Sequence, residues 1–486
     1  MGYVKGQDRR QVIISSLDEM ITEDNPVRLM DLLVEGLISQ APEKYRWKGH
    51  SKSGRPAYSA SDLLKLYLYG YSNKIVSSRK LEMECHRNLE LKWLLNNLTP
   101  DFKTIADYRR DNAEAISEMT ISFNVLLKSK ELIRGDLMAI DGTKIKANAN
   151  PGKNLSQSEV TAKICEYEKE ILRYLYLLQD NDIKDDLVEL DEGKLNTVES
   201  IQDKISDLTD KKEHLEECLN RIKKNRGSNA SSSDPESRLV KNRQELFYGY
   251  NLQVIVDSLH KLIATAQMRQ SPNDLHQMLP ALETLKKELG IEPEIIVGDK
   301  GYDNPSALQA VEQSGKTEVY VPVEESRDQY VKQNFIFDEE NNCYICPRGH
   351  TLKQKRGLHK SRGRMGILYQ CKAEICNKCP DKGSCTDAKN GRSITRLVDE
   401  QWREDYVKRV QSESVKSLLQ RRMCLIEHVF GVLKCRMGKI PLLLRGRDKV
   451  QTEINLYVTA YNMNRIITIL GFDKVREMIM SMNTPV

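Results

Sequence analysis

Two short apolar runs in this chain each end on a single aspartate. Residues 137–149 read LMAIDGTKIKANA, and their apolar run stops at Asp141 before an alternating pattern. Residues 293–302 read PEIIVGDKGY, and this second run stops at Asp299. Such runs predict strands with a buried face, and each of the two predicted strands carries one carboxylate at the end of its apolar run. This arrangement is typical of enzymes that hold a divalent metal, although a lone strand aspartate is more often a turn or cap residue.

A third carboxylate lies on an amphipathic helix predicted over residues 421–439, RRMCLIEHVFGVLKCRMGK. Glu427 flanks an apolar stripe, and Lys434, seven residues later, is predicted on the same face. The stripe consists of Ile426, Phe430, Leu433 and Met437. Two aspartates and a glutamate can bind two divalent ions, which clamp the attacking and leaving oxygens of a phosphoryl transfer. The alternative interpretation is a surface glutamate paired with a lysine.

These motifs and several others resemble the DDE transposases of bacterial insertion sequences, from about Asn25 to Asn464. The matching segments are SSRKLEMECHRNLELKWLL, TPDFKTIADYRRDN, AIDGTKIKANA, GDKGYDN, IEHVFGVLK and LLLRGRDKVQTEINLYVTAYNMNRI. Position by position, the resemblance implies that Asp141, Asp299 and Glu427 are catalytic and hold two Mg²⁺ (or Mn²⁺) ions per active site. It also implies an α/β fold with a ribonuclease-H-like mixed sheet flanked by helices.

The same resemblance implies a function and its partners. The activity would be strand cleavage at the ends of an element, followed by strand transfer into target DNA. The substrate would be double-stranded DNA with terminal inverted repeats, bound by a homodimer in the DNA complex. In this family, Lys434 matches a lysine that follows the glutamate.

Length and composition set limits on the interpretation. A chain of 486 residues suggests several structural units. Its hydrophobic content of 39% and charged content of 30% are those of a globular protein, and a net charge of +5 gives no global argument for nucleic acid. The first residues lack the apolar core of a signal peptide, and no run approaches the roughly 18 apolar residues of a membrane span. We therefore expect a cytoplasmic protein without a membrane partner.

Residues 1–130 are predicted to form a helical DNA-binding domain. Ser59 to Asp62 offer a cap for one helix, and Thr104 is predicted to cap another that runs on through IADYRRDNAEAISEM. Within this domain, residues 44–55 are basic, contain no acid and include Arg46, Trp47 and Lys48. Such a mixture suits contacts with phosphates and bases, whereas the alternative is a solvated loop whose aromatic residues pin it to the domain.

The catalytic domain is expected in three pieces, residues 131–150, 246–323 and 396–486. Between the first two, residues 151–245 carry apolar residues at spacings of three and four on both sides of a polar turn. This pattern predicts an antiparallel helical hairpin, or a short coiled coil, with a structural or subunit-contact role, followed by a linker. A strand pair, a helix and a fifth strand near residues 319–323 complete the predicted sheet.

The second insertion, residues 324–395, is rich in cysteine. It contains two C-x2-C pairs, and the chain has 11 cysteines in all without a signal peptide. This spacing predicts a small zinc-ribbon-like unit with a structural Zn²⁺ ion. Its predicted ligands are Cys343, Cys346, Cys376 and Cys379, with Cys371 and Cys385 as rivals. Reduced free thiols and an iron–sulfur cluster are the alternatives.

Basic residues of this insertion and of the last acidic helix are predicted to bind DNA. No acid occurs over residues 341–373, where Arg356, Lys360 and Arg362 stand among other basic residues. Lys434 and Arg436 supply a second candidate surface. Three functions therefore remain in competition: a transposase, a metal-dependent nuclease without strand transfer, and a non-enzymatic zinc-ribbon DNA-binding regulator.

Overall fold

The computed structural model describes residues 12, 14–46, 56–149, 154–155, 157–181, 188–190, 194–196, 198–224, 230–231, 233–241, 245–323, 330–361, 364–397, 400–437 and 442–482. The chain divides into two compact units. The first unit comprises Met1–Ile295 and Cys424–Val486, and the second comprises Ile296–Met423. Each unit is described by itself.

Helices make up the N-terminal part of the first unit, as predicted. Their starts follow capping chemistry, because the side chain of Asn25 accepts from the Val27 N–H and that of Ser59 accepts from the Asp62 N–H. The elements are α1 (Pro26–Gln40), η1 (Pro42–Tyr45), α2 (Ala60–Ser72), α3 (Ser78–Arg87), α4 (Leu89–Leu94), α5 (Phe102–Asp111) and α6 (Ala113–Ser129).

The prediction that Thr104 caps a helix was wrong. The cap of α5 is Asp101, whose Oδ1 accepts from the N–H groups of Lys103 and Thr104, each at 3.0 Å. The Thr104 hydroxyl instead donates to Asp101 Oδ2 at 2.7 Å. The predicted continuous helix also breaks at Asn112, whose side chain donates to the Tyr108 carbonyl at 3.0 Å. Asparagine competes with the backbone for such bonds, so two helices form where one was expected.

A mixed sheet flanked by helices forms the α/β part of the chain. Its strand order is β10-β9-β1-β7-β6, with β8 also paired to β7. Strand β7 runs antiparallel to β1, β6 and β8, and it pairs with β1 from Met138 to Lys146. The strands are β1 (Leu137–Lys146), β6 (Arg238–Lys241), β7 (Leu246–Asp257), β8 (Ile263–Arg269), β9 (Ile295–Val297) and β10 (Glu318–Tyr320). The predicted fifth strand thus occurs as β10, slightly earlier in the chain.

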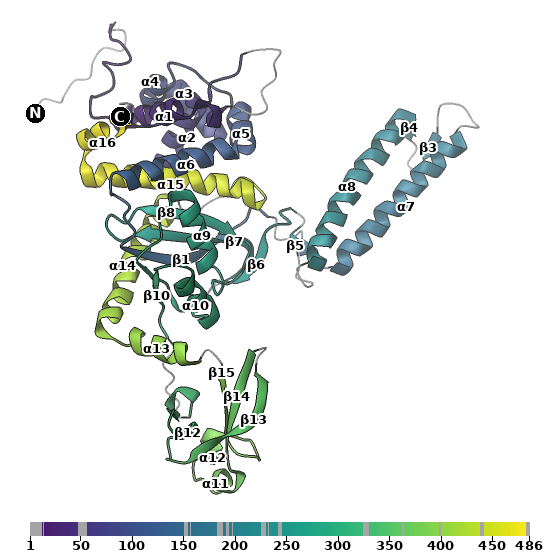
Figure 1. The fold of residues 1–486 in the computed structure, drawn as a ribbon. Coiled ribbons are helices and arrows are strands. Elements are labelled where there is room, and N and C mark those ends of the chain that lie inside the picture. The colour runs from purple at the N-terminus through teal and green to yellow at the C-terminus, as the bar shows by residue number, and fades with distance from the viewer. Residues whose placement is uncertain are drawn as a thin grey trace, which may run out of the picture. The chain divides into compact units, whose positions relative to one another are not determined.

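Three helices cover the strands of the first unit: α6, α9 (Met278–Leu289) and α15 (Arg447–Leu470). Figure 1 shows α15 lying along α6 and next to β8. Buried amides join these layers, since Asn124 donates to the carbonyls of Ile263 and Ala264 at 3.1 and 3.0 Å. Asn462 donates to the Ile263 carbonyl at 2.9 Å and to the Asn124 side chain at 2.9 Å. A last helix, α16 (Phe472–Met480), packs against α15 and α1.

The predicted helical hairpin occurs as α7 (Gln157–Asn181) and α8 (Val198–Lys224), which pack against each other. Val160, Ile164 and Leu215 form its small core. Lys212 on α8 donates to Glu168 on α7 at 2.9 Å, which adds an ion pair between the two helices. Short strand pairs accompany the helices: β2 (Asn154–Leu155) with β5 (Ala230–Ser231), and β3 (Val188–Leu190) with β4 (Lys194–Asn196).

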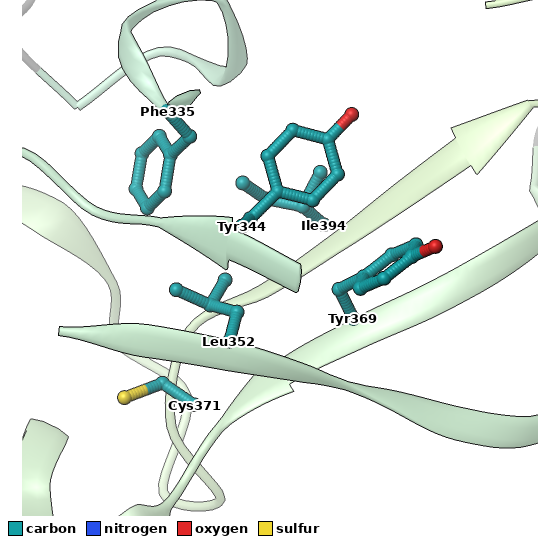
Figure 2. Packing of buried hydrophobic residues seen from close by; sticks show 6 residues of the cluster. All are labelled: Phe335, Tyr344, Leu352, Tyr369, Cys371 and Ile394. Atoms are coloured by element: carbon teal, nitrogen blue, oxygen red, sulfur yellow. The ribbon is translucent and has the colours of Figure 1, made fainter. Parts of the chain in front are cut away.

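The second unit contains a separate antiparallel sheet with the order β11-β12-β13-β14-β15. Figure 2 shows its core, in which Phe335, Tyr344, Leu352, Tyr369, Cys371 and Ile394 pack together. Its strands are β11 (Ile336–Asp338), β12 (Cys343–Ile345), β13 (Thr351–Ser361), β14 (Arg364–Cys371) and β15 (Ser393–Leu397). The remaining elements of this unit are η2 (Lys300–Tyr302), α10 (Pro305–Ser314), η3 (Lys332–Asn334), α11 (Ala373–Asn377), α12 (Lys382–Cys385) and α13 (Glu400–Val410).

Candidate active site and cysteine cavity

Asp141 lies where β1 changes from a buried strand to a half-exposed one. The four residues before it are buried, and Asp141 to Lys144 are of intermediate exposure. In the ladder with β7, Asp141 stands opposite Val254. One carboxylate oxygen, Oδ1, accepts from the Gly142 N–H at 2.8 Å, which fixes the orientation of the carboxylate. The strand therefore presents an oriented acid at its middle, as the sequence pattern predicted.

A polar network lies beside Gly142, the residue after Asp141. Asp274, in the loop between β8 and α9, accepts from Gln253 at 2.6 Å and from Asn251 at 2.7 Å. Lys144 makes an ion pair with the same Asp274 oxygen at 3.3 Å. Successive strand residues point to opposite faces, so this network occupies the face opposite Asp141. Sequence reasoning missed it, because the only local signal was an aspartate in a polar turn.

Asp299 belongs to the second unit, where it follows β9 and caps the short helix η2. Its Oδ1 accepts from the Gly301 N–H at 2.8 Å, so this carboxylate too is oriented by a main-chain donor. Gly298, the residue before Asp299, donates its N–H to the Tyr320 carbonyl at 3.0 Å. Tyr302 is buried behind the turn.

Glu427 is exposed on α14 (Glu413–Met437). The predicted stripe next to it is confirmed where side chains are described, since Ile426, Phe430 and Leu433 are buried. Lys434 is exposed on the same helix, with its Nζ 5.4 Å from the centre of the Phe430 ring. Buried apolar residues therefore hold the helix next to Glu427, and the cation of Lys434 lies two turns further along the same helix.

His428, the neighbour of Glu427, faces two cations of the same unit. Burial lowers the pKa of His428, and Arg465 and Lys261 lower it further. A neutral imidazole therefore sits beside Glu427 at neutral pH. This histidine was not among the residues that the sequence singled out.

The carboxylates are divided between the units, with Asp141 and Glu427 in the first and Asp299 in the second. Among the residues that the structure describes, no group of three or more His, Cys, Asp and Glu side chains is arranged to hold a metal ion. The donor set itself suits Mg²⁺ or Mn²⁺, since both prefer carboxylate oxygens. Within the described ranges, none of the helices combines the length and apolarity that a membrane crossing needs.

Five cysteines line one cavity of about 30 Å³ in the second unit. They are Cys346, Cys371, Cys376, Cys379 and Cys385. Burial, a hydrogen bond with Cys376 and the proximity of Cys346 raise the pKa of the Cys371 thiol to about 12. Three of the four predicted zinc ligands line this cavity, together with both rivals. The fourth predicted ligand, Cys343, is buried on β12 and is not among the lining residues.

Backbone donors point at two of these sulfur atoms. The His350 N–H donates to the Sγ of Cys346 at 3.3 Å, and the Arg392 N–H donates to the Sγ of Cys376 at 3.4 Å. Hydrogen bonds of this kind orient the side chains of metal ligands. The spacing of C-x2-C pairs could not reveal that Cys371 joins them, because that depends on how β14 and α11 pack.

The predicted DNA-contact residues are scattered over both units. Arg46 is exposed after η1, and Arg356 is exposed on β13. Trp47, Lys48 and Arg362 lie outside the described residues, as do the side chains of Lys360 and Arg436.

Two segments of the chain match families of transposase domains. Residues 345–467 match the family described as Transposase DDE domain, and residues 15–111 match Transposase domain (DUF772). The match to a DDE domain implies a transposase enzyme that uses a divalent metal. No curated protein matches it significantly.

A solved structure is also similar to the chain, namely the piggyBac transposase in a synaptic complex with hairpin DNA. The two share 9% sequence identity, and the match covers 95% of this chain and 87% of that one. The TM-score of 0.25 is too low to relate their elements one by one.

Proposed function

We propose that the protein is a DNA transposase that cleaves DNA at the ends of an element and joins the freed ends to target DNA. The observation that carries the proposal is the match to a transposase DDE domain over a segment that contains Glu427. The proposal assigns Asp141, Asp299 and Glu427 as the three catalytic carboxylates. It also assigns a ribonuclease-H-like architecture to the sheet, with β1 and β9 as the strands that carry the aspartates.

The chemistry of these carboxylates fits the proposed role. Asp141 and Asp299 each have one oxygen tied to a main-chain N–H at 2.8 Å, so neither side chain has to be ordered at the moment of binding. Two Mg²⁺ (or Mn²⁺) ions held by the three carboxylates would supply a nucleophile and stabilise the charge on the reacting phosphate. The chain's own contribution is to fix the carboxylates and the DNA.

The partner in this proposal is double-stranded DNA, comprising the terminal inverted repeats and a target, bound by a homodimer. Lys434 is exposed, with its Nζ 5.4 Å from the centre of the Phe430 ring, and a cation at the surface suits a phosphate contact. Arg46 and Arg356 are also exposed, and we assign them to the DNA-binding surface together with Trp47, Lys48, Lys360, Arg362 and Arg436.

The activity can be tested with a plasmid that carries the DNA flanking the gene. Incubation with Mg²⁺ should nick or linearise it, and supplying a pre-cut end with a target plasmid should give joined products. Cleavage without joining would instead identify a nuclease without strand transfer. Binding without cleavage at any divalent metal concentration would identify a DNA-binding regulator and would overturn the proposal.

We further propose that the cysteine cavity holds a structural Zn²⁺ ion. Its wall offers more thiols than the four that a closed tetrahedral site needs, and two of them already accept backbone N–H bonds. Zinc would add folding energy to a sheet with a small core of its own.

Elemental analysis tests the zinc site without any need for activity. The purified protein should hold about one zinc per chain, and Cys371→Ser or Cys376→Ser should lose it. Cys343→Ser is the matched control, because this buried cysteine lies outside the cavity, and it should retain the metal. Loss of zinc from Cys343→Ser and Cys376→Ser, with zinc retained by Cys371→Ser, would favour the ligand set of the two C-x2-C pairs. Visible absorption with iron would indicate an iron–sulfur cluster, and absence of both metals would exclude either site.

A further inference from the structure

Residues 442–447, LLLRGR, form a surface segment held by buried acids, which we call the arginine segment. The N–H groups of Leu443 and Leu444 donate to Glu453 Oε1 at 3.0 and 2.7 Å. Glu453 lies on α15 and is completely buried. Burial raises its pKa, while the Arg109 guanidinium and the two N–H groups lower it. One buried side chain thus fixes the first half of the segment.

A second buried acid fixes the other half. Asp234, also completely buried, accepts from the Gly446 N–H at 3.1 Å and from the Tyr250 hydroxyl at 2.8 Å. Its neighbour Glu236 accepts from the Arg447 N–H at 2.5 Å. Burial raises the pKa of Asp234. A buried carboxylate destabilises the fold unless its hydrogen bonds are kept. The backbone turns between the two arginines at Gly446, where φ is +84°.

The arginine segment is also joined to the end of the strand that carries Asp141. Asn148, two residues after β1, donates from its side chain to the Leu443 carbonyl at 2.8 Å. The Asn148 carbonyl in turn accepts from the Arg445 Nε at 3.0 Å. Arg445 and Arg447 are both exposed. The bond at Nε holds the exposed Arg445 side chain in position, and Arg447 is paired with Asp448 at 2.9 Å.

The arginine segment has more hydrogen bonds to buried carboxylates than a connecting loop needs. Surface loops ordinarily satisfy their N–H groups with water, whereas this one uses two completely buried carboxylates. Rigid support from packed neighbours is typical of segments that must present a side chain accurately to a ligand. The side chains presented here are guanidinium groups, which suit the paired oxygens of a phosphate.

We propose that the arginine segment is a preformed binding surface for the phosphate backbone of duplex DNA. The proposal rests on the proposed transposase function and adds to it a surface and its distance from the reaction. Asn148 is seven residues beyond Asp141, and an extended chain spans about 3.3 Å per residue, so at most about 23 Å separate them. A duplex rises about 34 Å in one turn. The phosphates contacted by Arg445 and Arg447 are those within about one turn of the cleavage site.

Salt titration tests this surface. A duplex taken from the DNA that flanks the gene is bound by the full-length protein at several salt concentrations, without divalent metal. Arg445→Gln should flatten the log–log salt slope by about 0.9, and the variant with Arg447→Gln added should flatten it by up to about 1.8. Arg134→Gln is the control, because Arg134 is exposed just before β1, at the other end of this strand. It should leave the slope unchanged.

A further variant tests whether the surface is preformed. Asn148→Ala removes the side chain that holds the Leu443 carbonyl but keeps every charge. Affinity should fall several-fold while the salt slope stays that of the wild type. Affinity equal to that of the wild type would contradict the preformed geometry.

The same protein samples are then assayed for cleavage with Mg²⁺, which separates the two proposals. Cleavage by the wild type with unaltered salt slopes in both arginine variants would overturn the DNA surface and leave the transposase function intact. Flattened slopes without cleavage would support the surface and contradict the function. Phosphate-ethylation interference should also disappear within one turn of the cut in the arginine variants and persist in Arg134→Gln.

Discussion

Gly142→Ala should destabilise the strand that carries Asp141. A Cβ atom at Gly142 would lie 2.4 Å from Asp274 Oδ1 and 2.5 Å from Gln253 Nε2, closer than any normal contact. These side-chain ends cannot simply move away, because they bind each other at 2.6 Å and Asn251 binds the same oxygen at 2.7 Å. The methyl group therefore breaks hydrogen bonds that hold β7 to the Asp274 loop.

The size of the effect follows from the number of bonds. Two hydrogen bonds at a net value of about 1 kcal/mol each, plus a half-buried ion pair from Lys144 worth less than about 1 kcal/mol, give a loss of about 2–3 kcal/mol. Chemical denaturation should show this loss as a lower free energy of unfolding, with an unchanged denaturant slope. DNA cleavage should fall as well, since Asp141 is the adjacent residue.

Gly431→Ala provides the matched control. Gly431 lies within α14, close to Glu427, and a Cβ there would meet no atom within 4 Å. Alanine in an exposed helix position should stabilise the protein by about 0.5–1 kcal/mol. Equal stabilities of the Gly142→Ala variant and the wild type would refute the argument that the Asp274 network is fixed.

Two further predictions concern other parts of the fold. Asn124→Ala removes two buried amide bonds to β8 and should cost about 2–4 kcal/mol in thermal or chemical unfolding, whereas Val125→Ala at the exposed neighbouring position should change stability by less than about 0.5 kcal/mol. In the cysteine-rich unit, hydrogen bonds from Arg348 and Tyr330 lower the pKa of Asp381 to about 2. Because the folded pKa lies below the ordinary value of 3.8, the stabilisation by Asp381 should be complete above about pH 4 and should disappear as the pH falls toward 2. The difference in Tm between wild type and Asp381→Asn should shrink over that range, and a constant difference would contradict the role of the ion pair.

Much of the fold could be predicted from local patterns. The apolar run before Asp141, the stripe beside Glu427 and the two long helices of the hairpin all occur where periodicity placed them. These features depend on which face of an element is buried, and that information lies in neighbouring residues. The triad itself stays a prediction, because its members lie in separate elements and local patterns do not reveal whether those elements bring them together.

Contacts between distant segments could not be predicted in the same way. Asp274 meets Gln253 and Asn251 only because β7 and the loop after β8 are brought together by the sheet. The gathering of Cys371 and Cys385 with the C-x2-C pairs likewise depends on the packing of the second unit. Thr104 is not the cap because Asp101, three residues earlier, is an equally good capping residue. The Asp101 side chain accepts the Thr104 N–H, so the helix begins before Thr104.

The most direct test of the proposed function is metal-dependent cleavage by carboxylate variants. Asp141→Asn, Asp299→Asn and Glu427→Gln each remove a charge but little volume, so folding and DNA binding should stay close to those of the wild type. Asp136→Asn and Glu413→Gln are controls, since both acids are exposed on the same segments of chain as Asp141 and Glu427.

With a plasmid that carries the flanking DNA and Mg²⁺ or Mn²⁺, we expect no cleavage by any of the three carboxylate variants and wild-type cleavage by both controls. Cleavage at a tenth of the wild-type rate or more by any one carboxylate variant would remove that residue from the catalytic set and contradict the proposed mechanism.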